Sequence, residues 1–400
     1  YDKIEPYVNS IQYSYNMDLH IYDKNDANYS NPISPGSDVM YELSLNYCIK
    51  YLTSTAKISV TYNRADRTYT LKSQGNTQAE EGFLAMLSNV EGIDINKMRT
   101  DLRGENGYLL TEQELVSIVN SKFGISIEQY KNSDLGLFNE MIDNTKFVHS
   151  QYTLLAGDWN KTQLYTTGTD DRTYSDVMLV LDKNNELDEY LLYSLGLINE
   201  NDVDQILNGI INKKSETIKI DYNKIVGKEF KLYLKTDTFD ELGNTTATET
   251  PKYYGSIVDS KKDNYIMLRI SGIVRPSDET NGGALSDGIV YPKALTDECI
   301  NRFNIATAEI LQANPTAKIK PIDKSNPSKI SIYANNFHMK EVIEDFIAEY
   351  NAGVDEEQKI TYTDYMGLMM STISSIVDIV SYVLIAFVSI SLVVSSIMIG

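Results

Sequence analysis

The sequence predicts an α+β protein in which a large polar domain is followed by a stalk helix and a membrane-spanning helix. Three observations lead to this prediction. Short runs with the two-residue period of strands alternate with runs that have the period of a helix. Hydrophobic residues make up 42% of the 400 residues, which is enough for a sizeable core. Residues 379–400 are mostly apolar and carry no charge.

Strand patterns dominate residues 1–65. β-branched residues and tyrosines recur there at nearly every second position, which is typical of half-buried strands. We expect strands at residues 11–22, 47–52 and 56–63.

Helical patterns dominate residues 66–150. Apolar residues recur there every three or four positions, as on one face of a helix. Thr111 is followed three residues later by Glu114, the capping-box pattern that begins a helix. We expect helices at residues 80–90, 111–123 and 136–144.

Strands and helices alternate after residue 150. The expected strands are 177–182, 216–222, 228–236 and 265–276, and the expected helices are 186–197, 201–211 and 294–314. Residues 329–362 then follow the order strand, helix, strand, which is typical of an α+β layer.

An apolar stripe, called the stalk seam here, leads toward the C-terminal apolar run. Its members alternate in spacing between four and three, as in a coiled coil: Tyr362, Met366, Met369, Ile373, Ile376 and Val380. Asp364, Ser371 and Asp378 occupy the other side. We expect residues 363–378 to form a stalk that packs along a partner helix. An amphipathic helix lying on its own domain is the alternative.

Residues 379–400 are long enough to cross about 30 Å of hydrocarbon as a helix. A buried core helix and a cleaved tail are the alternatives. No Lys or Arg follows Lys359, whereas cytoplasmic flanks are rich in both. We therefore expect a protein of the cell membrane with residues 1–378 on the extracytoplasmic side. The chain starts at Tyr1 without a leader and stops at Gly400 within the apolar run, so we expect an earlier membrane helix upstream.

The net charge of −20 disfavours nucleic acid and anionic lipid as partners. An acidic surface of this kind either keeps the domain solvated or attracts cationic peptides. Cys48 and Cys299 fit no metal or redox motif. Two buried free thiols are favoured over one long-range disulfide.

Motifs for catalysis and metal binding are not found in the sequence. It contains neither GxxxxGK[ST] nor GxSxG, and His20, His149 and His338 stand in dissimilar contexts. The acidic run at 182–189 lacks the glycine that a calcium loop needs at its sixth position. A turn before a helix is the better interpretation of this run. We expect no catalytic residue, metal or cofactor in these 400 residues.

Several stretches resemble one known family. They are QYTLLAGDWN at 151–160, DVMLVLDKNNELDEYLLYSLGL at 176–197, IMLRISGIVRP at 266–276, GIVYPKALTDECI at 288–300, and the run from Tyr362 to Gly400. These stretches are similar to the extracytoplasmic domains of ABC transporter permeases with FtsX-like membrane domains, of the MacB type, in a Firmicutes-like subgroup. Gly157 and Trp159 lie in the first stretch, and we expect both to be packing residues.

The resemblance implies a domain inserted between two membrane helices. Its parts would be a membrane-proximal α/β subdomain made of residues 1–65 and 323–362, a helical insert at 66–150, an inserted β-rich subdomain at 151–322, a stalk helix at 363–378 and a membrane helix at 379–400.

The resemblance also implies mechanotransmission. ATP and Mg would be bound by an associated ABC ATPase domain or subunit, and its cycle would move two stalks of a homodimer to export or release a substrate outside. Two alternatives stay open. One is a domain that senses a cationic peptide and signals to a histidine kinase, and the other is a tethered extracellular enzyme.

Overall fold

The computed structural model has an α+β fold, as the sequence predicts. The chain divides into two compact units, Asn9–Ile332 and Tyr1–Val8 with Tyr333–Gly400. The structure describes residues 4–25, 32–34, 37–63, 66–124, 126–127, 138–159, 164–166, 172–211, 214, 218–244, 257–278, 283–365, 367, 381–385 and 387–389.

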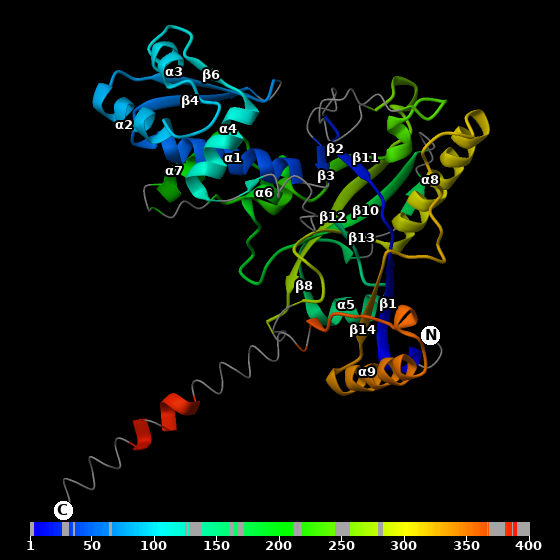
Figure 1. The fold of residues 1–400 in the computed structure, drawn as a ribbon. Helices are drawn as coiled ribbons and strands as arrows, with labels where there is room; N and C mark the ends of the chain where they lie inside the picture. The colour runs from blue at the N-terminus through cyan, green and yellow to red at the C-terminus, as the bar shows by residue number, and fades with distance from the viewer. Residues whose placement is uncertain are drawn as a thin grey trace, which may run out of the picture. The chain divides into compact units, whose positions relative to one another are not determined.

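The larger unit contains a nine-stranded mixed sheet among the strands that the structure describes (Figure 1). Its main path runs β3 (Pro32–Ser34), β2 (Leu19–Asp23), β11 (Glu229–Leu234), β12 (Ile266–Pro276), β10 (Thr173–Val180), β13 (Gly288–Tyr291) and β7 (Phe138–Glu140). In addition, β8 (Tyr152–Gly157) pairs with β12, and β9 (Leu164–Thr166) pairs with β10. The neighbours β10 and β12 are parallel and mostly buried, which explains their nearly continuous apolar sequences.

Helices cover this sheet with apolar side chains. From α8 (Lys293–Ala313), Leu295 and Cys299 enter the same core as Val177 and Leu268 of the sheet. The short helix α6 (Glu189–Ser194) contributes Leu191. The described residues of this region also form α5 (Thr145–Gln151) and α7 (Glu200–Ile211), with short 3-10 turns at Tyr222–Lys224, Lys235–Thr238 and Asp259–Lys261.

A second core belongs to a part that we call the small lobe, the described residues of 37–127. It combines helices α1 (Ser37–Ser54), α2 (Thr77–Leu87), α3 (Ile95–Leu102) and α4 (Glu112–Phe123) with a sheet of β4 (Ile58–Asn63), β5 (Thr68–Ser73) and β6 (Tyr108–Leu110). Buried side chains from Tyr41 to Ile127 form one cluster. This core crosses position 65, where the sequence analysis separates two parts.

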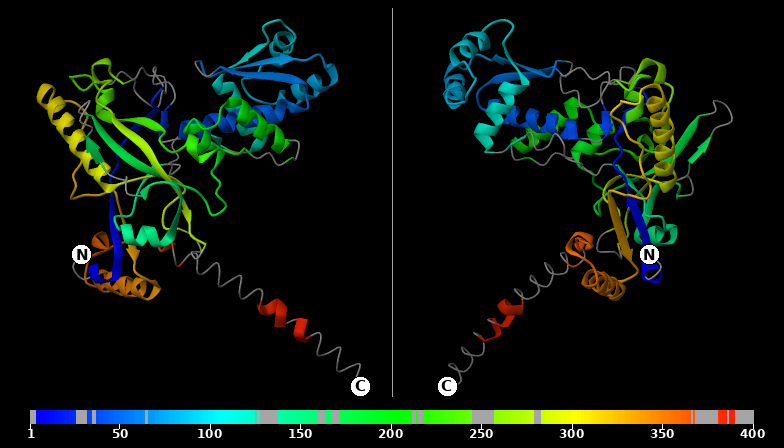
Figure 2. Two further views of the ribbon diagram at one scale, coloured as in Figure 1. Left: turned by 180° about the vertical axis from the view of Figure 1, so that it is seen from behind. Right: turned by 45° about the vertical axis from the view of Figure 1, so that its right-hand side comes forward.

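The smaller unit contains residues from the beginning and from the end of the sequence, and we call its described residues the terminal unit. It contains the 3-10 turn η1 (Glu5–Tyr7), helix α9 (Phe337–Ala352) and the turn at Glu356–Gln358. Helix α9, drawn in orange, lies beside the N-terminal turn η1 (Figure 2). The Tyr7 and Phe346 rings lie 5.9 Å apart between centroids. The Asn335 amide N–H donates to the Tyr7 carbonyl at 3.0 Å. Strands β1 (Val8–Ser14) and β14 (Lys329–Ala334) pair with each other, and each continues from one unit into the other.

The strongest sequence signals are confirmed. The helix expected at 294–314 is α8, displaced by one residue at each end. At the start of α4 the Thr111 hydroxyl accepts from the Glu114 N–H at 3.3 Å, and Glu114 accepts from the Thr111 N–H at 2.8 Å. The predicted capping box is therefore formed.

Two segments have the wrong secondary structure in the sequence analysis. Residues 47–52 are not a strand but part of α1, because Leu45, Cys48 and Ile49 form one buried helical face toward the small-lobe core. Residues 136–144 do not form a helix in their described part. Phe138–Glu140 is instead a strand that pairs in parallel with β13, so tertiary pairing overrides a helical pattern.

Two further strands are not formed by the described residues of their segments. In 216–222, the Asp221 side chain accepts from the Asn223 N–H at 2.9 Å and begins a 3-10 turn. After α9, the Ile360 N–H donates to Asn351 Oδ1 at 2.8 Å, and the Ile360 carbonyl accepts from Asn351 Nδ2 at 2.9 Å. Its backbone is therefore paired without a neighbouring strand.

The turn interpretation of residues 182–189 is confirmed. The Asp182 Oδ1 atom accepts from the backbone N–H groups of Asn184 and Glu186, and Asn185 has a left-handed φ of 64°. Helix α6 then begins at Glu189.

The expectation of two buried free thiols is also confirmed, because Cys48 and Cys299 are both unpaired and buried. Burial raises the pKa of Cys48 to about 11 and that of Cys299 to about 12. Both thiols are therefore protonated at neutral pH.

His20 makes the stability of the larger unit depend on pH. It lies on β2 and is 4% exposed, and burial lowers its pKa from 6.5 to about 4. The unfolded chain therefore binds the proton more tightly than the folded protein does. We expect stability to fall as pH decreases from about 6.5 toward 4, by up to ~3 kcal/mol from this group.

Urea unfolding of the protein and of His20→Phe between pH 7.5 and 4.5 tests this expectation. The variant should lose this part of the pH dependence. His338→Phe, at an exposed position on α9, serves as the matched control and should keep it. If the unfolding free energies of the protein and of His20→Phe changed with pH in the same way, the pH dependence could not be assigned to His20.

Candidate functional site

The stalk seam is only partly within the described residues. Tyr362 is described, whereas Met366, Met369, Ile373, Ile376 and Val380 lie outside the described residues. Within the ranges that the structure describes, no helix combines the length and apolar character needed to cross a membrane.

The segment that leads into the seam is fastened to α9. Lys340 of α9 lies 2.7 Å from an Asp364 carboxylate oxygen and 3.1 Å from Glu344, and the contact with Asp364 raises the pKa of Lys340. The Tyr362 hydroxyl donates to Glu344 at 3.4 Å. Two carboxylates thus contact the Lys340 ammonium group, and the phenol bonds to one of these carboxylates.

A helix begins directly after this fastening. The Asp364 carboxylate accepts from the Gly367 N–H at 2.8 Å, which is the geometry of an N-cap. Tyr365 and Gly367 are helical. Asp364 therefore has two roles, because it pairs with α9 and caps the helix that follows.

Gly157 and Trp159 occupy different environments. Gly157 has φ of 80°, and a Cβ atom added there would lie 2.1 Å from the Ser271 carbonyl oxygen and 2.5 Å from the Gly272 Cα atom. This is a position that only glycine fits. Trp159 is half-buried, and its ring lies 4.2 Å from the His149 ring between centroids.

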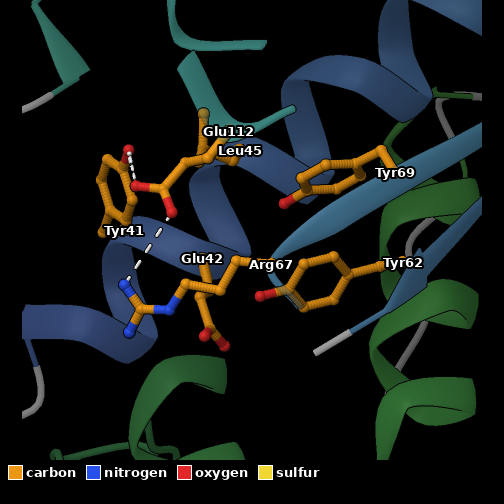
Figure 3. Close-up of a pocket in the computed structure, with 7 residues that line it drawn as sticks. All are labelled: Tyr41, Glu42, Leu45, Tyr62, Arg67, Tyr69 and Glu112. Carbon is orange, nitrogen blue, oxygen red and sulfur yellow. Dashed lines mark hydrogen bonds and ion pairs between the residues drawn. The ribbon is translucent and has the colours of Figure 1, made fainter. Parts of the chain in front are cut away.

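The small lobe contains a hollow that sequence reasoning missed, and we call it the tyrosine hollow (Figure 3). Its free space is about that of one water molecule. Helix α1 contributes Tyr41, Glu42 and Leu45, and α4 contributes Glu112 from its first turn. The Tyr41 hydroxyl donates to Glu112 Oε1 at 2.8 Å.

The hairpin of β4 and β5 closes the other side of the tyrosine hollow. Tyr62 and Tyr69 face each other across the strands, with their rings stacked at 4.7 Å. Figure 3 shows both hydroxyl ends turned toward the side where Glu112 and Arg67 lie. Arg67 lies 3.9 Å from Glu112. Its φ of 51° is unusual for a residue with a side chain.

One polar atom in the tyrosine hollow stands out. Tyr69 is 1% exposed, and its hydroxyl has no hydrogen-bond partner among the residues that the structure describes. Buried hydroxyl groups are normally paired with protein or water. Burial, followed by the neighbouring Tyr62, Glu42 and Glu112, raises the pKa of Tyr69, so this hydroxyl stays protonated at neutral pH.

The sequence carried only a weak signal for this hollow. Its residues come from four separate elements, and tyrosines are common throughout the chain, 29 in all. Only the capping box at Thr111 drew attention to the neighbourhood of Glu112.

Comparisons with models of protein families, with curated proteins and with solved structures find no match to this chain.

Proposed function

We propose that this chain is the extracytoplasmic domain of an ABC transporter permease with an FtsX-like membrane domain, which couples cytoplasmic ATP hydrolysis to export or release of a substrate outside the membrane. In this proposal residues 363–378 are the stalk, residues 379–400 cross the cell membrane, and the chain works as a homodimer. A separate or fused ATPase domain binds ATP and Mg. A membrane-proximal subdomain and an inserted subdomain form the part of the chain before the stalk.

The terminal unit carries this proposal. A domain inserted between two membrane helices must receive and return the chain at nearly the same place. The Tyr7 ring packs in a tilted arrangement against the Phe346 ring of α9, and Asn335 donates hydrogen bonds to the backbone carbonyls of Pro6 and Tyr7. The first described segment is thus bound to α9 and to the residues just before it, as such an insertion requires.

The fastening at Asp364 supports the mechanical part of the proposal. A lever transmits motion only if its attachment is stiffer than its surroundings. Ile360 is held by Asn351, and Asp364 by Lys340. These contacts fix the segment before the stalk to a helix of 16 residues, so a displacement of the stalk would move α9 with it.

Cross-linking of the stalk in the full-length transporter tests the proposal. The experiment places Ser374→Cys in a background in which Cys48 and Cys299 are replaced by alanine. A membrane-impermeant bifunctional thiol reagent is added outside, with and without ATP. We expect a cross-linked dimer whose yield changes severalfold with ATP, because the two stalks move against each other.

Two matched variants locate the seam. Ile373→Asp places a charge in the seam and should abolish the ATP-dependent change. Ser371→Asp adds the same charge on the other side and should leave it in place. Absence of labelling from outside would overturn the proposed topology. Cross-linking without any ATP dependence would instead favour the alternative of a peptide sensor that signals to a histidine kinase.

A further inference from the structure

The tyrosine hollow has the chemistry of a binding site for a small cation. It combines the two carboxylates of Glu42 and Glu112 with a single guanidinium, that of Arg67, so its formal charge is negative. Glu42 is only 8% exposed, which places this carboxylate where solvent screens it weakly. An anionic ligand would be repelled by both carboxylates.

The hydroxyl of Tyr69 adds an independent observation. Its oxygen is buried, lacks a partner among the described residues and lines the hollow. A phenol oxygen accepts hydrogen bonds from N–H donors as well as donating its own proton. The stacked rings of Tyr62 and Tyr69 add π surfaces that attract cations.

The shape of the tyrosine hollow restricts the ligand to a compact group. Three tyrosine rings, Leu45 and the Arg67 side chain surround it. Arg67 and Glu112 are 27% and 23% exposed, whereas Tyr41 and Tyr69 are each 1% exposed. The hollow is thus open at Arg67 and closed at the tyrosines. A primary ammonium group is the size of a water molecule and has three N–H donors, whereas a planar guanidinium needs more room.

We propose that the tyrosine hollow binds a primary ammonium group, of the kind found on a lysine side chain or a peptide N-terminus, with Glu42, Glu112 and the Tyr69 hydroxyl as acceptors. The ammonium enters past Arg67, and the alkyl chain that carries it lies at the mouth. This inference does not depend on the permease proposal, because it concerns only residues of the small lobe.

Ligand-observed NMR titration of the purified full chain with n-butylammonium tests this inference. We expect saturable binding in the millimolar range, as suits a single small contact. Two probes act as matched controls. n-Butyltrimethylammonium has the charge without the N–H donors, and n-butanol has the length without the charge. Neither should bind measurably. Binding of butyltrimethylammonium equal to that of butylammonium would overturn the proposed hydrogen bonds.

Tyr69→Phe is the decisive variant. It removes only the hydroxyl, so binding of n-butylammonium should weaken about tenfold, as for a lost hydrogen bond to a charged group. The melting temperature should not fall, because this hydroxyl has no partner among the described residues. Glu42→Gln should weaken binding of n-butylammonium to a similar extent, and it tests the site independently of Tyr69. Unchanged affinity in both variants, or no saturable binding to the unmodified protein, would mean that the hollow holds only water and would overturn the proposal.

Discussion

Replacing Gly157 by alanine should destabilise the larger unit by about 3 to 5 kcal/mol and lower its melting temperature by about 10 °C. Two physical effects combine at this position. Alanine resists the φ of 80°, and its Cβ atom would lie 2.1 Å from the Ser271 carbonyl oxygen. That oxygen also accepts the Asp158 N–H at 3.0 Å. Strands β8 and β12 would have to separate, and this hydrogen bond would be lost.

Gly227→Ala is the matched control for this prediction. Gly227 has φ of 88°, yet nothing lies within 4 Å of its added Cβ atom. Its substitution therefore measures backbone strain alone, at about 1 kcal/mol. The difference between the two variants, measured by thermal and urea unfolding, isolates the close approach of the strands. Equal losses of unfolding free energy would show that β8 shifts at no cost in stability, and that glycine is needed at position 157 only for its backbone conformation.

Gly157 shows what could and what could not be predicted from the sequence. The motif around it pointed to a packing role, but the reason lies in Ser271 and Gly272, more than one hundred residues later in the chain. Long periodic segments were easier to predict. Helix α8 and the capping box of α4 follow from local spacing alone, since their signals lie within one element.

The wrong assignments share one physical cause. Residues 47–52 have the β-branched and aromatic composition of a strand, but the apolar face that they share with Leu45 packs into the small-lobe core as a helix. Residues 138–140 have helical neighbours in sequence, but β13 offers them a parallel ladder. Local preference is worth less than burial in both places.

The candidate sites also depend on contacts between residues that lie far apart in the sequence. The terminal unit depends on contacts between residues about 340 positions apart, such as Tyr7 and Phe346, which no local pattern reveals. The tyrosine hollow gathers side chains from α1, β4, β5 and α4. Glu112 from the first turn of α4 and scattered tyrosines become a cluster only when the small lobe is folded.

Replacing Arg269 by methionine should destabilise the larger unit by about 3 kcal/mol, near the low end for breaking a buried ion pair. Asp176 and Arg269 are partners in the β10–β12 register. The guanidinium donates to both carboxylate oxygens, at 2.9 and 3.2 Å, and the Asp176 side chain is only 3% exposed. Without Arg269 this carboxylate keeps the Tyr165 hydroxyl, at 3.3 Å, but loses the two hydrogen bonds from the guanidinium.

The prediction attributes the loss to burial of the ion pair. The control is therefore an ion pair with a similar distance that is exposed to solvent. Lys235 and Asp18 lie 2.6 Å apart with side chains 49% and 61% exposed, and Lys235→Met should lose less than about 1 kcal/mol. The double variant Arg269→Met with Asp176→Asn should recover much of the loss, because the buried side chain at position 176 then carries no charge. Urea unfolding measures all three variants. A loss in Arg269→Met as small as that in Lys235→Met would mean that water reaches Asp176 between β10 and β12 and that the pair adds little to the stability of the central sheet.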